Sequence, residues 1–193
     1  MNLTNREGTL KNIDKRSSYK FNHEGKQTIN YLITMIKIRL YNKADQIGID
    51  KMIELIATEF KLPISNPNKA SSPVLDKFWV ALDDNTIMGT VGVINIEGEF
   101  SMLKMMFVKK EYRGKEYSIA SMLLNKVFDW CNSQGVDTIY LGTMEQFKAA
   151  HKFYENNGFE KINSNELPLS FITNPIDDVF YKRKLIRNNT SHS

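Results

Sequence analysis

Residues 105–124 read MMFVKKEYRGKEYSIASMLL, and this stretch decides the fold of the chain. Its pattern predicts an apolar strand, then a polar and basic turn, then the first turns of an amphipathic helix. This order points backbone N–H groups and a helix N-terminus at one place. Unpaired N–H groups and the helix dipole both favour negative charge, so the stretch predicts a phosphate-binding turn.

The segments around this turn predict an α/β (α+β) domain with a mixed, mostly antiparallel sheet of six to seven strands flanked by helices. Period-two alternation and short apolar runs indicate strands, and apolar residues at three-to-four spacing indicate helices. The expected strands are 36–40, 78–82, 87–96, 100–108, 138–143, 159–162 and 179–185, and the expected helices are 44–60, 118–132 and 147–157, with one or two short helices after the first. Polar turns at 83–86 and 97–99 predict an antiparallel meander of three strands.

A second informative segment lies about thirty residues after the turn, where residues 149–159 read AAHKFYENNGF. The two segments together resemble motifs A and B of the GNAT superfamily of acyl-CoA-dependent N-acetyltransferases. The resemblance rests on Phe107-Val108, Tyr112-Arg113-Gly114, Ala120 and Leu123-Leu124 for motif A, and on Ala149, Ala150, Tyr154 and Gly158-Phe159 for motif B. It extends from about Met35 to Leu185 and implies a GNAT-like fold.

Motif A departs from the family pattern at its first glycine. The leucine spacing fits when Lys115 fills the glutamine or arginine position, which makes the turn two residues longer than usual and puts Ser118 where the family has glycine. Glycine there would leave the backbone free to approach a pyrophosphate. We expect Ser118 to compensate by capping the helix or by donating its hydroxyl.

The resemblance implies acetyl-CoA as cosubstrate, no metal, and a role for the backbone of the strand and the turn. Backbone groups of Met106, Phe107 and Val108 would meet the pantetheine arm and the acyl carbonyl. The turn would hold the pyrophosphate through Arg113, Gly114, Lys115, Glu116, Tyr117, Ser118, Ile119 and Ala120. Lys109, Lys110, Arg113 and Lys115 add positive charge, of which one or two meet CoA phosphates and the rest are solvated.

In this family an amine attacks the thioester directly, so an acid is needed for the leaving thiolate. Tyr154 occupies the matching position and is the catalytic candidate; the alternative is a core aromatic. No base is assigned, because the family's glutamate position holds Met102. Glu97 and Glu99 are interpreted as solvated turn residues and His151 as a surface histidine, and water is an alternative carrier of the proton.

The acceptor site is expected between residues 60–74 and 165–177. These loops hold the apolar residues Phe60, Pro63, Phe171 and Pro175, and the acids Glu166, Asp177 and Asp178 lie in or beside the second loop. Carboxylates there would attract a cationic amine. Residues 166–171 are either a substrate lid or an ordinary connecting loop.

Composition restricts the remaining classes. The 193 residues are 41% hydrophobic and 25% charged, as in an ordinary globular protein, and hold no apolar run long enough to span a bilayer. With no apolar signal segment and one cysteine, we expect a cytoplasmic protein in which Cys131 is a buried hydrophobe. Three scattered histidines make a zinc site improbable.

The net charge of +4 is concentrated in residues 1–34, which carry six cations against three acids. We interpret residues 1–34 as a polar basic extension, disordered or loosely helical, residues 35–187 as the N-acetyltransferase domain, and residues 188–193 as a polar tail. Nucleic-acid binding is unlikely because the folded body is nearly neutral.

The sequence therefore predicts an N-acetyltransferase that moves an acetyl group from acetyl-CoA to an unidentified primary amine in a ternary complex. A catalytically silent acyl-CoA-binding module or sensor is the alternative, suggested by Met102 and Ser118. A nucleic-acid-associated protein that uses its basic extension is the third hypothesis. For the oligomeric state of the chain we consider a homodimer.

Overall fold

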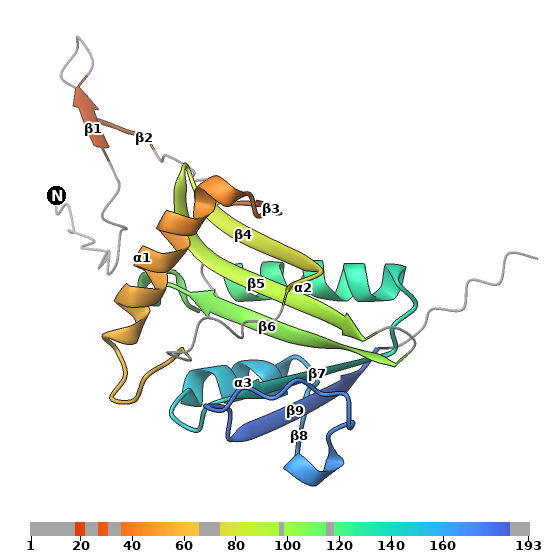
Figure 1. Cartoon of the computed structure of the whole chain (residues 1–193). Coiled ribbons are helices and arrows are strands. Elements are labelled where there is room, and N and C mark those ends of the chain that lie inside the picture. Colours follow the sequence, from red (N-terminus) through yellow and green to blue (C-terminus); the bar gives the residue numbers. More distant parts are fainter. Residues whose placement is uncertain are drawn as a thin grey trace, which may run out of the picture. The chain divides into compact units, whose positions relative to one another are not determined.

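The computed structural model describes residues 18–21, 27–30, 36–65, 74–96, 99–114 and 118–185. Residues 36–185 hold a seven-stranded sheet in the order β3-β4-β5-β6-β7-β9-β8 (Figure 1). All neighbouring pairs are antiparallel except β6 and β7, which are parallel. The predicted mixed, mostly antiparallel sheet is therefore confirmed.

The elements follow the predicted order with ends that differ by a few residues at most. The strands are β3 (Lys37–Leu40), β4 (Lys77–Asp83), β5 (Thr86–Ile96), β6 (Phe100–Val108), β7 (Thr138–Thr143), β8 (Glu160–Ile162) and β9 (Val179–Lys184), and the helices are α1 (Gln46–Ala57), α2 (Ile119–Ser133) and α3 (Lys148–Asn156). The described residues also hold the short 3₁₀ helices η1 (Lys43–Asp45), η3 (Lys110–Tyr112) and η4 (Ser164–Glu166). Of the short helices expected after α1, none lies in residues 58–65 or 74–76; residues 66–73 are outside the described ranges.

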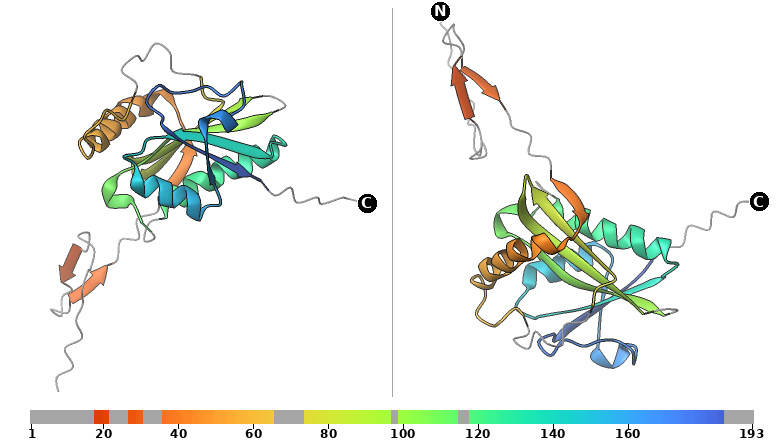
Figure 2. Two further views of the ribbon diagram at one scale, coloured as in Figure 1. Left: turned by 90° about the horizontal axis from the view of Figure 1, so that it is seen from below. Right: turned by 45° about the horizontal axis from the view of Figure 1, so that its top comes forward.

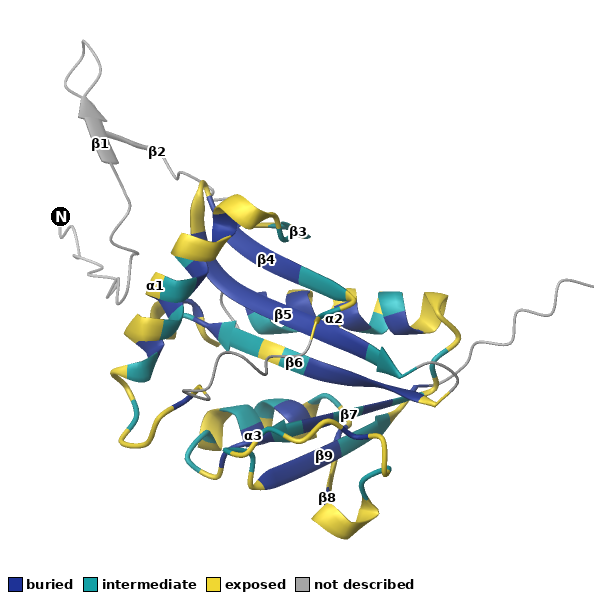
Figure 3. Cartoon of the chain, in the orientation of Figure 1, coloured by how far each residue is buried: buried dark blue, intermediate teal, exposed yellow. Residues whose placement is uncertain are grey.

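Helices cover both faces of the sheet. Alternation along β4 sends Trp79 and Ala81 into the core with α2 and α3, and Val80 and Leu82 into the core with α1. Figure 2 shows α1 on one side of the sheet and α2 and α3 on the other. The central strands are consequently buried on both faces, as the dark blue of β4 and β5 in Figure 3 indicates.

The helix α1 buries a narrower stripe than the sequence predicts. Ile49, Met52 and Ile56 are buried at helical spacing against β4 and β5. Ile47 and Leu55, which the pattern included, are exposed instead. A helix that lies on a sheet buries one face only, and these two residues lie outside it.

A third core cluster lies on the α1 side of the sheet, around β6, β8 and β9. It contains Ile94, Phe100, Met102, Ile162, Phe171 and Phe180. Phe171 belongs to the segment between β8 and β9, and its ring lies edge-on to that of Phe180 with 6.1 Å between the ring centres. This segment is thus packed onto the sheet by an aromatic anchor, which fits the connecting-loop interpretation of residues 166–171.

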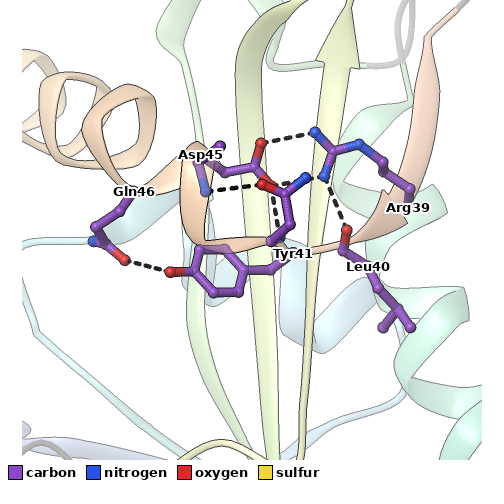
Figure 4. Close-up of polar contacts among 7 residues, drawn as sticks. Arg39, Leu40, Tyr41, Asp45 and Gln46 are labelled. Atoms are coloured by element: carbon purple, nitrogen blue, oxygen red, sulfur yellow. Dashed lines mark hydrogen bonds and ion pairs between the residues drawn. The ribbon is translucent and has the colours of Figure 1, made fainter.

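A two-point ion pair fixes the start of the helical layer to the edge strand β3 (Figure 4). The Arg39 guanidinium donates to both carboxylate oxygens of Asp45 at 2.7 Å, and the Asn42 backbone N–H donates to the same carboxylate at 2.8 Å. These bonds hold the pKa of Asp45 below its ordinary value. Because bidentate pairs are geometrically specific, Arg39 sets the angle at which η1 and α1 leave β3.

Residues 1–35 form a separate unit. Its described residues, β1 (Ser18–Phe21) and β2 (Gln27–Asn30), pair as an antiparallel two-stranded sheet. They differ from the disordered or loosely helical extension that composition predicts, because cross-strand pairing satisfies backbone groups without a large apolar core. The rest of that extension lies outside the described residues, as does the expected tail at 188–193.

Cys131 is a fully buried residue of α2, as predicted, and burial raises the pKa of its thiol to about 11. Among the helices of the described ranges, none is both long and apolar enough to cross a bilayer.

We predict that Gly89→Ala destabilises the domain by about 1–3 kcal/mol, the usual range for overpacking. A Cβ at this position would lie 2.8 Å from the Phe107 carbonyl oxygen and 3.1 Å from Cδ1 of Leu123, so backbone must shift. Chemical denaturation measures the loss. Gly92→Ala in the same strand is the control, because its Cβ meets only the flexible side-chain end of Leu75. Equal losses in the two variants would contradict the prediction.

Candidate active site

A β-bulge interrupts β6 at the place where the sequence predicts the pantetheine-binding strand. Thr90 pairs with Phe107 while Gly92 pairs with Lys104, so β6 holds one extra residue here relative to β5. Met105 has a left-handed backbone with φ of 53°, and the buried Thr90 hydroxyl donates to its carbonyl at 2.7 Å. A bulge of this kind bends its strand and increases the local twist.

The bend separates β6 from its parallel neighbour. The two strands pair only at Ser101 with Ile139 and at Met102 with Tyr140, and they diverge beyond these pairs in Figure 1. Met106, Phe107 and Val108 therefore have β5 on one side and no strand partner on the other. In this geometry the backbone groups on that side of the strand are available to an extended ligand; binding of a ligand by these three residues stays a prediction.

The predicted phosphate turn leads from η3 into α2. Gly114 has φ of 103°, a conformation that favours glycine, and the Ser118 N–H donates to its carbonyl at 3.3 Å. The first intrahelical bond runs from the Met122 N–H to the Ser118 carbonyl, so helix geometry leaves the N–H groups of Ile119, Ala120 and Ser121 without intrahelical acceptors. Ile119 itself is buried and Ala120 half-buried against the core. Lys115, Glu116 and Tyr117 lie outside the described residues.

Ser118 occupies the N-cap position of α2 but its side chain makes no capping hydrogen bond, contrary to one of the two expectations. The reason is its backbone: φ is 52° and ψ is 19°, in the left-handed region, whereas a capping residue is normally extended. The position therefore needs the conformation that glycine adopts freely, which is the residue that motif A has there.

Arg113 is committed to protein contacts. Its two terminal nitrogens donate to the Glu59 carboxylate at 2.8 and 2.9 Å, and its Nε donates to the Val108 carbonyl at 2.8 Å. The side chain thus joins the end of α1 to the end of β6. Of the cations expected to serve the turn, Arg113 is therefore bonded to other groups of the protein. The described lysines nearby are Lys109, which is half-buried, and Lys110, which is exposed.

Tyr154 lies on α3 in an aromatic cluster. Its ring is 5.6 Å from Phe159, 5.9 Å from Tyr181 and 5.7 Å from Phe153. Burial, and then the negative charge of Asp177, raise the pKa of its phenol, so Tyr154 stays protonated at neutral pH. The residue has the packing of a core aromatic and also lies in the electrostatic field of a carboxylate.

The other proton carriers considered from the sequence are distributed differently. His151 is buried, not a surface residue, and its Nε2 lies 3.0 Å from the Met144 carbonyl oxygen. The prediction of a surface histidine was wrong because α3 turns this face toward β7 and β9. The hydrogen bond to the Met144 carbonyl gives one ring nitrogen a partner in this buried position. Met102 is fully buried, Glu99 accepts a hydrogen bond from Ser170, and Glu97 is outside the described residues.

Asp177 is among the acids that the sequence predicts for the acceptor loop, but the sequence does not single it out; it lies just before β9. Its carboxylate lies over the backbone of Gly142 in β7, so closely that a Cβ on Gly142 would be 2.4 Å from Oδ2. Burial raises the pKa of Asp177 to about 6, against the opposing effect of Lys104. The other acids of this loop are bound elsewhere: Asp178 accepts from the Glu145 N–H at 2.7 Å, and Glu166 closes a capping box on Asn163.

Lys104 is a group that sequence reasoning missed. It precedes the bulge on the same face of β6 as Met102, its Nζ donates to the Ile172 carbonyl at 3.1 Å, and it lies 5.1 Å from the centre of the Phe171 ring. Burial lowers its pKa, and Asp177 opposes this shift. A signal was present, because Lys104 is the only charge in the apolar run MLKMMFV.

Comparisons with known proteins agree with this geometry. The family model for the acetyltransferase (GNAT) domain matches residues 75–161. The crystal structure of a GNAT-family acetyltransferase from Staphylococcus aureus Mu50 is 36% identical, with a TM-score of 0.69, over 79% of this chain and 100% of that one. The chain belongs to the GNAT family and carries an acyltransferase domain.

Two further relatives are informative. N-acetylaspartate synthetase from Danio rerio is 30% identical over 109 residues, which are 54% of this chain and 38% of that protein. The chain thus matches well under half the length of this relative. N-acetylglutamate synthase from Neisseria gonorrhoeae, complexed with coenzyme A and N-acetyl-glutamate, has the same fold at a TM-score of 0.62 and 16% identity, over 79% of this chain and 36% of that one.

We predict that Ser118→Gly is more stable than Ser118→Ala by about 1 kcal/mol, because a β-carbon costs roughly 1–2 kcal/mol in the left-handed region and the entropy of glycine offsets part of this. Both variants lose the hydroxyl, so their difference isolates the backbone conformation. Urea denaturation of the two proteins measures it. A more stable alanine variant would show that φ is not positive at this position.

A second prediction concerns stability and pH. The raised pKa of Asp177 means that its ionised form is disfavoured in the folded state, so stability should fall as pH rises from about 4 to about 6 and stay lower above. Asp177→Asn should therefore stabilise the protein at pH 8, on the order of 1–3 kcal/mol at about 1.4 kcal/mol per pKa unit, and much less at pH 4.5. Denaturation at both pH values tests this, with the exposed Asp129→Asn on α2 as control; equal effects at both pH values would refute it.

Proposed function

We propose that this chain transfers the acetyl group of acetyl-CoA to a primary amine by direct attack within a ternary complex. The observation that carries the proposal is the bulged, unpaired end of β6 beside the start of α2, with the Asp177 carboxylate packed against Gly142 of the neighbouring strand β7. The end of β6 and the start of α2 offer N–H groups to the acyl and phosphate oxygens, and Asp177 offers a base.

The residues divide the reaction between them in this proposal. The Asp177 carboxylate accepts a proton from the amine as its nitrogen attacks the thioester carbon. A backbone N–H of residues 106–108 stabilises the oxyanion of the tetrahedral intermediate. Collapse breaks the C–S bond, and Tyr154 donates its proton to the thiolate, so the products are an N-acetyl amide and free CoA. Asp177 then releases its proton to solvent and Tyr154 takes one up from solvent, so both groups return to their starting states.

The turn and helix start hold the CoA phosphates in the same proposal. Gly114, Ile119 and Ala120 contribute through backbone N–H groups, together with Lys115, Glu116 and Tyr117 of the predicted turn. Ser118 contributes through its left-handed backbone, which sets the start of α2. Arg113 acts indirectly, because its bonds to Glu59 and Val108 fix the position of the strand end from which the turn departs.

The proposal predicts a kcat/KM that falls as pH is lowered through about 6, where Asp177 takes up its proton. Asp177→Asn should lower kcat/KM by about 10²–10⁴-fold and remove this limb, since a base must be ionised to act. Tyr154→Phe should lower kcat. The measurement is thiol release with an amine panel that includes amino acids, because a relative is named N-acetylaspartate synthetase, beside diamines and aminoglycosides.

Asp178→Asn is the matched control. The charge of Asp178 raises the pKa of Asp177, so this variant should stay active and shift the acid limb to lower pH. Calorimetric binding of acetyl-CoA without turnover of any amine would favour the catalytically silent acyl-CoA-binding module. A wild-type level of activity in Asp177→Asn would exclude Asp177 as the base.

A further inference from the structure

Two half-buried groups of opposite charge are held apart near the separation of β6 and β7. Lys104 belongs to β6, and Asp177 lies on Gly142 of β7. Each influences the other electrostatically, yet no direct ion pair joins them in the described part of the chain. The chain thus places a cation on one of the two diverging strands and packs a carboxylate from a loop against the other.

Neither group is saturated by the protein. Lys104 Nζ has three N–H donors and, among the described residues, one acceptor, the Ile172 carbonyl. The Asp177 carboxylate accepts no hydrogen bond from a described residue. Charges that are removed from water without partners are destabilising, so such a pair is expected where a ligand completes the bonding.

The side-chain surroundings limit what lies between the two groups. Lys104 is backed by Phe171, which is packed against Phe180 and Tyr140, so its ammonium cannot move toward the core. Asp177 is fixed against a strand residue with no side chain of its own. A ligand between them meets a positive end held by β6 and a negative end held against β7.

We propose that the acceptor is a small zwitterion, an amine that also carries a carboxylate, with its carboxylate on Lys104 and its amino group on Asp177. This inference rests on the proposed transfer to an amine and names the class of that amine. The amino end donates a hydrogen bond to Asp177, the same group that accepts the proton of the amine as its nitrogen attacks. The carboxylate end accepts hydrogen bonds from the two remaining N–H donors of Lys104, and this orients the amine nitrogen toward β6.

The test compares amino acids with the amines that remain after loss of the carboxylate: L-phenylalanine with phenethylamine, L-aspartate with β-alanine and L-lysine with cadaverine. β-Alanine keeps the side-chain carboxylate of aspartate, so only the phenylalanine and lysine pairs measure the effect of losing the carboxylate. The aspartate pair shows which of the two carboxylates of aspartate is bound. In the wild-type protein, kcat/KM should be at least tenfold higher for the amino acid than for its amine in any pair of which a member is acetylated. Lys104→Met should reduce this ratio to near one, mainly through KM.

Lys104→Arg keeps the charge and should retain the preference, while Lys126→Met on the exposed face of α2 should leave the ratio unchanged. Thermal melts of each variant show that it is folded. A wild-type protein that acetylates the decarboxylated amines as well as the amino acids overturns this inference and leaves the proposed function standing.

A binding measurement covers the case in which no amine is acetylated, which would refute the proposed function. The melting temperature in the presence of CoA is measured with each amino acid and each decarboxylated amine. A rise with an amino acid that is absent with its amine and absent in Lys104→Met supports the zwitterion site without catalysis. No rise with any amino acid overturns it.

Discussion

One extra residue in β6 is the constraint on which the site depends. The backbone at Met105 turns into the left-handed region, and beyond it β6 stays paired with β5 but leaves β7. A parallel pair that continued to the strand ends would close the sheet and consume the N–H and C=O groups that a ligand needs. The fold therefore keeps a complete sheet over Ser101 and Met102 and an open one from the bulge onward.

The neighbouring residues stabilise this irregularity at specific atoms. Thr90, fully buried in β5, donates its hydroxyl to the Met105 carbonyl, which the bulge withdraws from the ladder. Gly89 lets the Phe107 carbonyl approach to a distance that no β-carbon would allow. Thr90 thus gives a donor to the carbonyl that the bulge takes out of the ladder, and Gly89 gives the adjacent backbone the room to approach.

The fold was predictable from the sequence because its signals are local. Strands 100–108 and 138–143 were predicted to the residue, since alternation and flanking turns define them without knowledge of the rest. The bulge was not predictable, because no glycine marks it in the run MLKMMFV. The Arg113–Glu59 pair and the packing of Asp177 on Gly142 join residues 54 and 35 positions apart. Contacts of that kind follow from topology: the sequence places Arg113 in the cofactor turn and Asp177 among the acids of the acceptor loop, but it cannot pair either of them with its partner.

The electrostatics of the two ends of the site differ in origin. At the proposed phosphate end, the positive side chain that the resemblance to motif A implied, Arg113, is neutralised by Glu59. Under this proposal the attraction for an anion comes from the backbone N–H groups at the start of α2, with Lys109 and Lys110 nearby, and backbone groups need no side-chain ordering to act. At the proposed acceptor end the charges are side chains, those of Lys104 and Asp177, which are half-buried. Such a site would hold the part of the ligand that all acyl-CoA molecules share through the backbone, and would leave the choice of acceptor to two side chains.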